Sequence, residues 1–120
     1  MNPMKLALIL AVNLLSNLLA AAAEPKGNLK ELMKSATWEF YNNPKATVPF
    51  AEFRFLDGGQ IECAHPNFLS TWDHLGGNKV KIVRTDGLYW VFDYRAAGRQ
   101  ATVVKYKDGL EDNNTIRVKR

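Results

Sequence analysis

Apolar and polar residues alternate along residues 79–94, KVKIVRTDGLYWVFDY, which predicts two β-strands joined by a tight turn. A three-residue loop over residues 85–87 brings apolar side chains opposite one another on one face of the hairpin. A two-residue loop would instead place apolar residues opposite charged ones. Gly87 can supply the positive φ at which three-residue loops commonly end. The predicted apolar pairs are Ile82–Trp90 and Val80–Phe92.

The same pattern recurs around two further loops that contain glycine, over residues 57–59 and 76–78. The predicted pairs there are Phe55–Ile61, Phe53–Cys63, His74–Val80 and Trp72–Ile82. The run 48–56 is expected to begin irregularly, because Pro49 cannot donate a hydrogen bond to a neighbouring strand. Further alternating segments lie at residues 37–41, 102–106 and 115–119.

One short helix is expected before the first strand, over about residues 29–35. Asn28 can cap it, Glu31 stands three residues later as in a capping box, and the apolar positions form one stripe. The predicted fold class is therefore all-β. An antiparallel up-and-down meander of about seven or eight short strands follows the helix and closes into a small barrel or, alternatively, folds into a two-layer sandwich.

The N-terminal residues 1–23 have the charge, the apolar run and the small residues of a secretory signal peptide. The alanines at 21–23 predict cleavage before Glu24. Residues 24–120 are then expected to form a single β-barrel domain, in which residues 24–35 are the leader and the short helix. We expect a secreted or periplasmic protein without stable membrane insertion after cleavage.

Charge and cysteine content add little to this prediction. The net charge of the full chain is +4, which favours no particular partner, and nucleic-acid binding is not expected. Cys63 is the single cysteine, so an intrachain disulfide is impossible. It is either a small buried apolar residue or one half of an intermolecular bridge. A monomer or weak oligomer is expected.

Catalytic and metal-binding motifs are absent from the sequence: there is no phosphate-binding glycine loop, no serine nucleophile elbow and no HExxH. We therefore assign no catalytic, cofactor or metal residues and expect a protein that is not an enzyme. The alternative is a small metal-dependent hydrolase that uses a cluster of potential ligands. Its residues are Cys63, His65, Asp73 and His74.

Aromatic residues provide the candidate ligand site. All three tryptophans fall on inward positions, where they either line a cavity or fill a small barrel. The candidate ligand-binding residues are Trp38, Trp72, Trp90, Phe92 and Tyr94. Tyr89 and Val91 point outward and are too apolar for a solvated face. We expect the helix or a partner protein to cover them.

Several segments together resemble the calycin-type secreted barrels, either lipocalin-like or avidin-like. They are LMKSATWEF at residues 32–40, FRFLDGGQI at 53–61, Trp72, and the hairpin at 79–94; Ala36 stands where the lipocalin Gly-x-Trp motif has glycine. The resemblance implies an exported binding module for a small molecule, a glycan or a protein surface. A structural or envelope-interaction protein that docks a partner through its outer sheet face is the alternative.

Overall fold

The computed structural model describes residues 29–120, and the predicted signal peptide and leader up to residue 28 lie outside this range. One short helix, eight strands and a 3₁₀ turn follow one another. Their bounds are α2 Leu29–Ser35, β1 Trp38–Tyr41, β2 Ala51–Phe55, η2 Asp57–Gly59, β3 Ile61–Cys63, β4 Leu69–Gly76, β5 Lys79–Arg84, β6 Tyr89–Arg95, β7 Gln100–Val104 and β8 Thr115–Val118. The all-β class with one preceding helix is confirmed.

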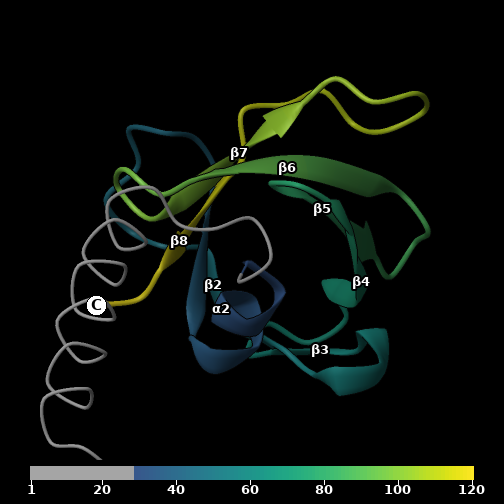
Figure 1. Cartoon of the computed structure of the whole chain (residues 1–120), viewed down its shortest axis with the longest axis horizontal. Coiled ribbons are helices and arrows are strands. Elements are labelled where there is room, and N and C mark those ends of the chain that lie inside the picture. Colours follow the sequence, from purple (N-terminus) through teal and green to yellow (C-terminus); the bar gives the residue numbers. More distant parts are fainter. Residues whose placement is uncertain (1–28) are drawn as a thin grey trace, which may run out of the picture.

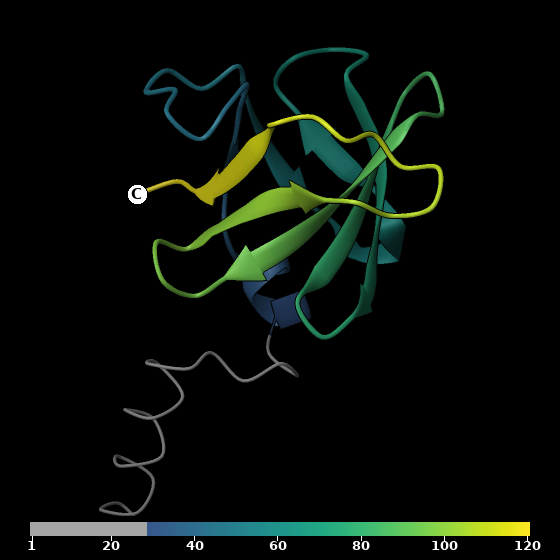
Figure 2. The same cartoon turned by 90° about the horizontal axis from the view of Figure 1, so that it is seen from above.

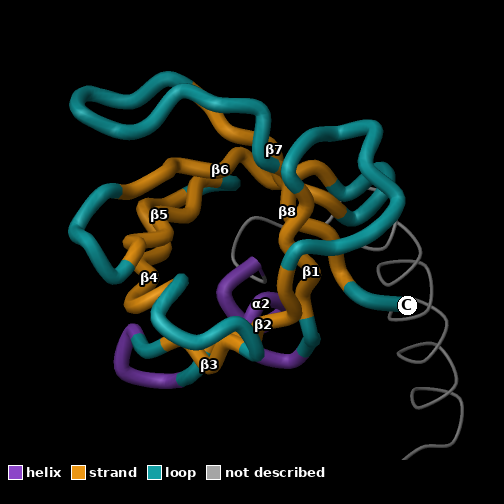
Figure 3. The backbone as a smooth tube through the Cα atoms, turned by 180° about the vertical axis from the view of Figure 1, so that it is seen from behind, coloured by secondary structure: helices purple, strands orange, loops and turns teal. Residues whose placement is uncertain are grey.

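All eight strands belong to one antiparallel sheet with the order β3-β2-β1-β8-β7-β6-β5-β4. Strands adjacent in sequence pair with each other, except β3 and β4, and β1 pairs with β8 through four residue pairs. The sheet therefore curls into a nearly closed barrel rather than a sandwich (Figures 1 and 3). A single bridge between Gln60 and Thr71 spans the remaining seam between β3 and β4.

The predicted registers of the three hairpins are confirmed. The observed pairs include Ile82–Trp90, Val80–Phe92, Phe55–Ile61, Phe53–Cys63, Trp72–Ile82 and His74–Val80. Gly87 has a φ of 89°, as the turn requires. The loop predicted at 76–78 is one residue shorter, because Gly76 still pairs with Lys79 after an irregularity in β4. As expected, the run 48–56 starts irregularly: β2 begins only at Ala51.

Helix α2 lies at one end of the barrel (Figure 2), and its apolar residues complete the interior. The side chains of Leu29 and Met33 are 3% and 0% exposed. The indole Nε1–H of Trp38 donates a hydrogen bond to the carbonyl oxygen of Met33 at 3.1 Å, which satisfies one of the carbonyls left unpaired at the helix end. Within residues 29–120, no helix is both long enough and apolar enough to cross a membrane.

The outward-facing residues Tyr89 and Val91 are largely covered within the chain itself, and Tyr89 stays half-buried. Coverage of this face by a partner stays a prediction. Val91 is 0% exposed, and the β7–β8 loop packs over the start of β6. Leu110 donates its backbone N–H to the carbonyl oxygen of Tyr89 at 2.7 Å. A Cβ added at Gly109 would lie 3.1 Å from the Tyr89 ring. The start of β6 on this face therefore contacts the β7–β8 loop of the same chain.

Candidate functional site: the cleft between α2 and β4

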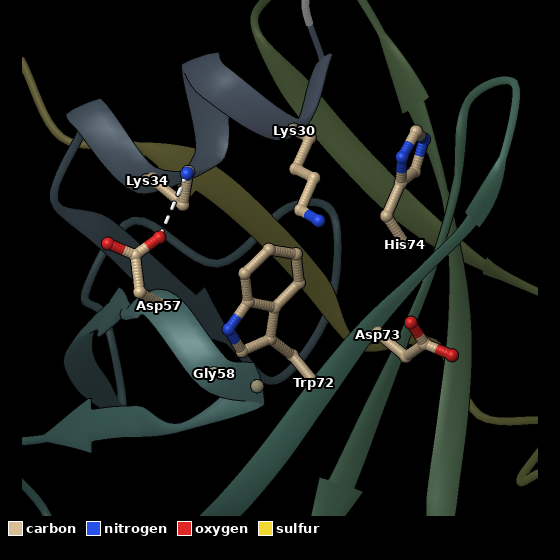
Figure 4. Close-up of a pocket in the computed structure, with 8 residues that line it drawn as sticks. Lys30, Lys34, Asp57, Gly58, Trp72, Asp73 and His74 are labelled. Carbon is tan, nitrogen blue, oxygen red and sulfur yellow. Dashed lines mark hydrogen bonds and ion pairs between the residues drawn. The ribbon is translucent and has the colours of Figure 1, made fainter.

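A cleft of about 380 Å³ opens at the helix end of the barrel (Figure 4). Helix α2 forms its roof, β4 its floor and one side, and the β2–β3 turn the opposite side. Helix α2 therefore covers one end of the barrel but leaves an open cleft beside β4. The mouths of β-barrels are common positions for ligand sites.

Strand β4 supplies the floor because side chains alternate along a strand. Trp72 and His74 point to one side of the sheet and Asp73, between them, to the other, yet all three residues line the cleft (Figure 4). The Trp72 side chain is held from below by a ring contact of 5.1 Å with Phe55 and by its Nε1–H, which donates to the carbonyl oxygen of Leu56 at 2.9 Å. A fixed indole thus joins the cleft to the core.

His74 contributes a half-buried imidazole at the side of the cleft. Its Nε2 lies 2.9 Å from the carbonyl oxygen of Gly77. Since a carbonyl oxygen only accepts, Nε2 carries the hydrogen in this contact. In the neutral ring, Nδ1 is then the acceptor, and it is the atom of this imidazole that a ligand can use.

Two lysines of α2 reach the cleft and differ in their pairing. The Lys34 Nζ lies 2.9 Å from Asp57 Oδ1 and 3.4 Å from Glu31 Oε1. The hydrogen bond with Asp57 raises the pKa of Lys34, and the same bond lowers the pKa of Asp57. Lys30 has no ion pair within 4 Å among residues 29–120; its ammonium points into the cleft (Figure 4), and its charge contributes to the lowered pKa of Asp57.

The β2–β3 turn forms a side of the cleft with two glycines in the left-handed region. Gly58 has a φ of 76° and Gly59 a φ of 77°. A Cβ added at Gly59 would lie 3.2 Å from the Trp72 carbonyl oxygen, whereas a Cβ at Gly58 would meet nothing within 4 Å. Gly59 therefore allows the turn to approach the backbone of β4 closely, while Gly58 mainly supplies the turn conformation.

Alanine at these glycines should separate the two requirements. Gly58→Ala is expected to lower the free energy of unfolding by about 1–2 kcal/mol, because alanine is strained at positive φ. Gly59→Ala should cost about 1 kcal/mol more, since its Cβ also presses on the backbone of Trp72. Urea denaturation of both variants measures the difference. Equal losses would show that the turn is not held close to β4.

The Lys34–Asp57 pair predicts a specific acid dependence. The pKa of Asp57 is lower in the folded than in the unfolded chain, so its contribution to stability is complete above pH ~4 and is lost as the pH falls through the folded pKa. The stability difference between the parent and Asp57→Asn should therefore shrink during acidification from pH ~6 to pH ~2. Urea denaturation across this range is the measurement. Asp108→Asn, in the exposed β7–β8 loop, is the control, and a constant difference for Asp57→Asn would contradict the pairing.

Comparison of the chain with protein-family models, curated proteins and solved structures finds no match. The fold and the geometry of the site are therefore the basis for any functional conclusion. The eight-stranded, nearly closed antiparallel barrel is established by the strand pairing, whereas membership of the calycins stays a prediction.

Four of the five aromatic residues predicted to bind a ligand lie in the packed interior. Trp38, Trp90, Phe92 and Tyr94 are between 0% and 4% exposed. Their rings contact one another or Phe40, with centroid separations such as 5.3 Å for Phe40–Trp90 and 6.1 Å for Trp38–Tyr94. Trp72 alone among the five lines the cleft. A ligand role for the other four stays a prediction.

The residues of the hydrolase alternative are not brought into one group. His65 stacks on Phe50 at 4.7 Å in the β3–β4 connection, while Asp73 and His74 lie further along β4 at the helix end. Cys63 is a half-buried thiol at the end of β3. Among residues 29–120, no three His, Cys, Asp or Glu side chains are placed so that they could hold a metal ion together.

Sequence reasoning missed Lys30 and Lys34 as site residues. The helix was predicted, but the sequence carries no signal for the side of the barrel mouth on which it docks. The glycines of residues 57–59 were identified as a turn, and the approach of this turn to β4 becomes visible only in the folded chain.

Proposed function

We propose that this protein is an exported, non-enzymatic binding module that holds a small polar molecule or a glycan residue in the cleft between α2 and β4. The observation that carries this proposal is an open cleft of about 380 Å³ in which the Trp72 side chain, 6% exposed, lies beneath polar groups of α2 and β4. The available groups are the Lys30 ammonium and the His74 Nδ1. Ligand pockets typically combine an aromatic surface with a few placed polar groups.

The packed interior supports the choice of the cleft over the barrel core. Trp38 and Phe92 are 1% and 0% exposed, and the aromatic rings around them are already in mutual contact. A ligand in the interior would have to displace these rings, which costs several kcal/mol of packing, whereas the cleft is open without rearrangement. Small barrels are generally filled by their own side chains.

The two alternatives have less support. Docking of a partner through the outer face of the central hairpin requires Tyr89 and Val91 to be accessible, and Val91 is fully buried. A metal-dependent hydrolase requires ligands that converge, and His65 and His74 lie in different parts of the barrel. The calycin-like pattern and the predicted signal peptide favour the binding module.

The proposal is tested by nuclear magnetic resonance of the three indole N–H groups during titration with a panel of saccharides and small polar metabolites. The Trp72 signal, assigned with Trp72→Phe, is expected to shift saturably with at least one compound. The Trp90 indole donates to Asp112 at 3.0 Å in another part of the barrel and is the internal control. Shifts of Trp38 and Trp90 without Trp72 would place the ligand in the interior and contradict the proposal.

His74→Ala tests whether the imidazole at the side of the cleft contributes to ligand affinity. It removes the available Nδ1 without touching the packed interior, so affinity for any compound that shifts Trp72 should fall by about threefold to tenfold. The control is His65→Ala, which removes the other histidine from the β3–β4 connection. Equal effects of the two variants would show that the loss does not come from the cleft.

A further inference from the structure

Strands β3 and β4 are neighbours in the nearly closed barrel but share no ladder of residue pairs. Every other pair of adjacent strands is joined by at least three residue pairs. Within residues 29–120, the bridge between Gln60 and Thr71 is the single pairing across this seam. The residues of β3 are all exposed or half-buried. Segments with few backbone hydrogen bonds and little burial open locally at a lower free energy than the rest of a fold.

One side chain of β4 holds the seam in place of a ladder. The Trp72 indole reaches the β2–β3 hairpin, where its Nε1–H donates to the carbonyl oxygen of Leu56 at 2.9 Å. Its ring also lies 5.1 Å from the ring of Phe55, at an interplanar angle of 66°. The backbones approach at the same place, because a Cβ added at Gly59 would lie 3.2 Å from the Trp72 carbonyl oxygen. These contacts across the seam all involve Trp72.

The β2–β3 hairpin has its other attachments on the side away from β4. Strand β2 forms three residue pairs with β1. The ion pair between Lys34 and Asp57, at 2.9 Å, joins the β2–β3 turn to α2. The cleft separates α2 from β4 at this end of the seam (Figure 4). The hairpin can therefore move away from β4 without the loss of any strand ladder.

We infer that the barrel has a lateral gate at the β3–β4 seam and that the Trp72 indole is its latch. The gate opens when the indole leaves Leu56 and Phe55 and the bridge at Gln60 separates. The ladders that join the strands from β3 through β8 to β4 stay paired. Opening widens the cleft, since residues on both sides of the seam line it. It also exposes the thiol of Cys63, which is half-buried at the end of β3 and packs against the core.

The rate at which Cys63 reacts with a maleimide, followed by mass spectrometry without denaturant, measures the opening. Trp72→Phe removes the latch hydrogen bond but keeps an aromatic ring, so it should accelerate the reaction by about threefold to tenfold. Trp90→Phe is the matched control, because it removes an indole hydrogen bond of 3.0 Å to Asp112, away from the seam. It should change the rate by less than about twofold. Equal acceleration by both variants, or none by Trp72→Phe, would overturn the inference.

The urea dependence of the reaction separates the gate from global unfolding. Opening of the gate exposes little surface, so the rate should be nearly independent of urea below the unfolding transition. Global unfolding would instead give a steep dependence. Urea denaturation should show that both variants lose stability, although only Trp72→Phe accelerates the reaction of Cys63. If the rate rose steeply with urea from the lowest concentrations, Cys63 would react through the unfolded chain and the lateral gate would be wrong.

Discussion

Replacing Trp38 with alanine is expected to lower the free energy of unfolding by about 3–5 kcal/mol, which is the range for removing a buried aromatic side chain. Trp38 is 1% exposed and lies edge-on to Phe55 at 5.6 Å and to Tyr94 at 6.1 Å. It also joins the barrel to α2 through the hydrogen bond to Met33. The melting temperature should fall by more than about 12 °C for a domain of this size, as measured by calorimetry.

A second substitution separates packing from the hydrogen bond. Trp38→Phe keeps most of the apolar volume but leaves the Met33 carbonyl without its donor, so it should cost only about 1–3 kcal/mol. Leu88→Ala, at a side chain that is 45% exposed, should change stability by less than about 0.5 kcal/mol. A small effect of Trp38→Ala, similar to that of Leu88→Ala, would show that the interior is not packed around Trp38.

Val91→Ser is expected to lower the free energy of unfolding by about 2–3 kcal/mol without changing the oligomeric state. Val91 is 0% exposed on the outer side of β6, so serine there loses apolar contacts and buries a hydroxyl. The prediction follows from the burial of Val91 within one chain, between its strand partners Lys81 and Val104. Urea denaturation at two protein concentrations and size-exclusion chromatography are the measurements.

Val48→Ser provides the matched comparison, because the same chemical change occurs at a valine that is 77% exposed. Its stability should stay within about 0.5 kcal/mol of the parent. If Val91→Ser left stability unchanged but weakened a concentration-dependent association, the outer face would be a partner interface, and the burial of Val91 within one chain would not contribute to folding.

The hairpins show how much of the fold could be predicted from local sequence. Residues 79–94 carry both the alternation that identifies the inward face and the glycine turn that sets the register. A slip of one residue would expose every apolar side chain of a strand, so the register has a strong energetic preference. The same reasoning placed Phe53, Phe55 and Trp72 on the interior face, where the structure shows them.

The path of the β7–β8 connection could not be predicted from local sequence. Residues 105–114 carry mostly polar and charged side chains and have no clear alternation. Their path over Tyr89 depends on a long-range hydrogen bond from Leu110 and on a close contact at Gly109. Neither contact has a sequence signature. The sequence therefore indicated that the outer apolar residues of β6 are covered, but it did not indicate which segment covers them.

The sequence by itself determined the strands, their inward faces and the hairpin registers, because these depend on side-chain alternation and on glycines at positive φ within a few residues of one another. Only the tertiary structure decided that β1 pairs with β8, that the interior is filled with aromatic rings and that α2 leaves a cleft beside Trp72. These features join segments far apart in the chain. They are set by the packing of the whole barrel, in which the balance among many weak contacts selects one arrangement.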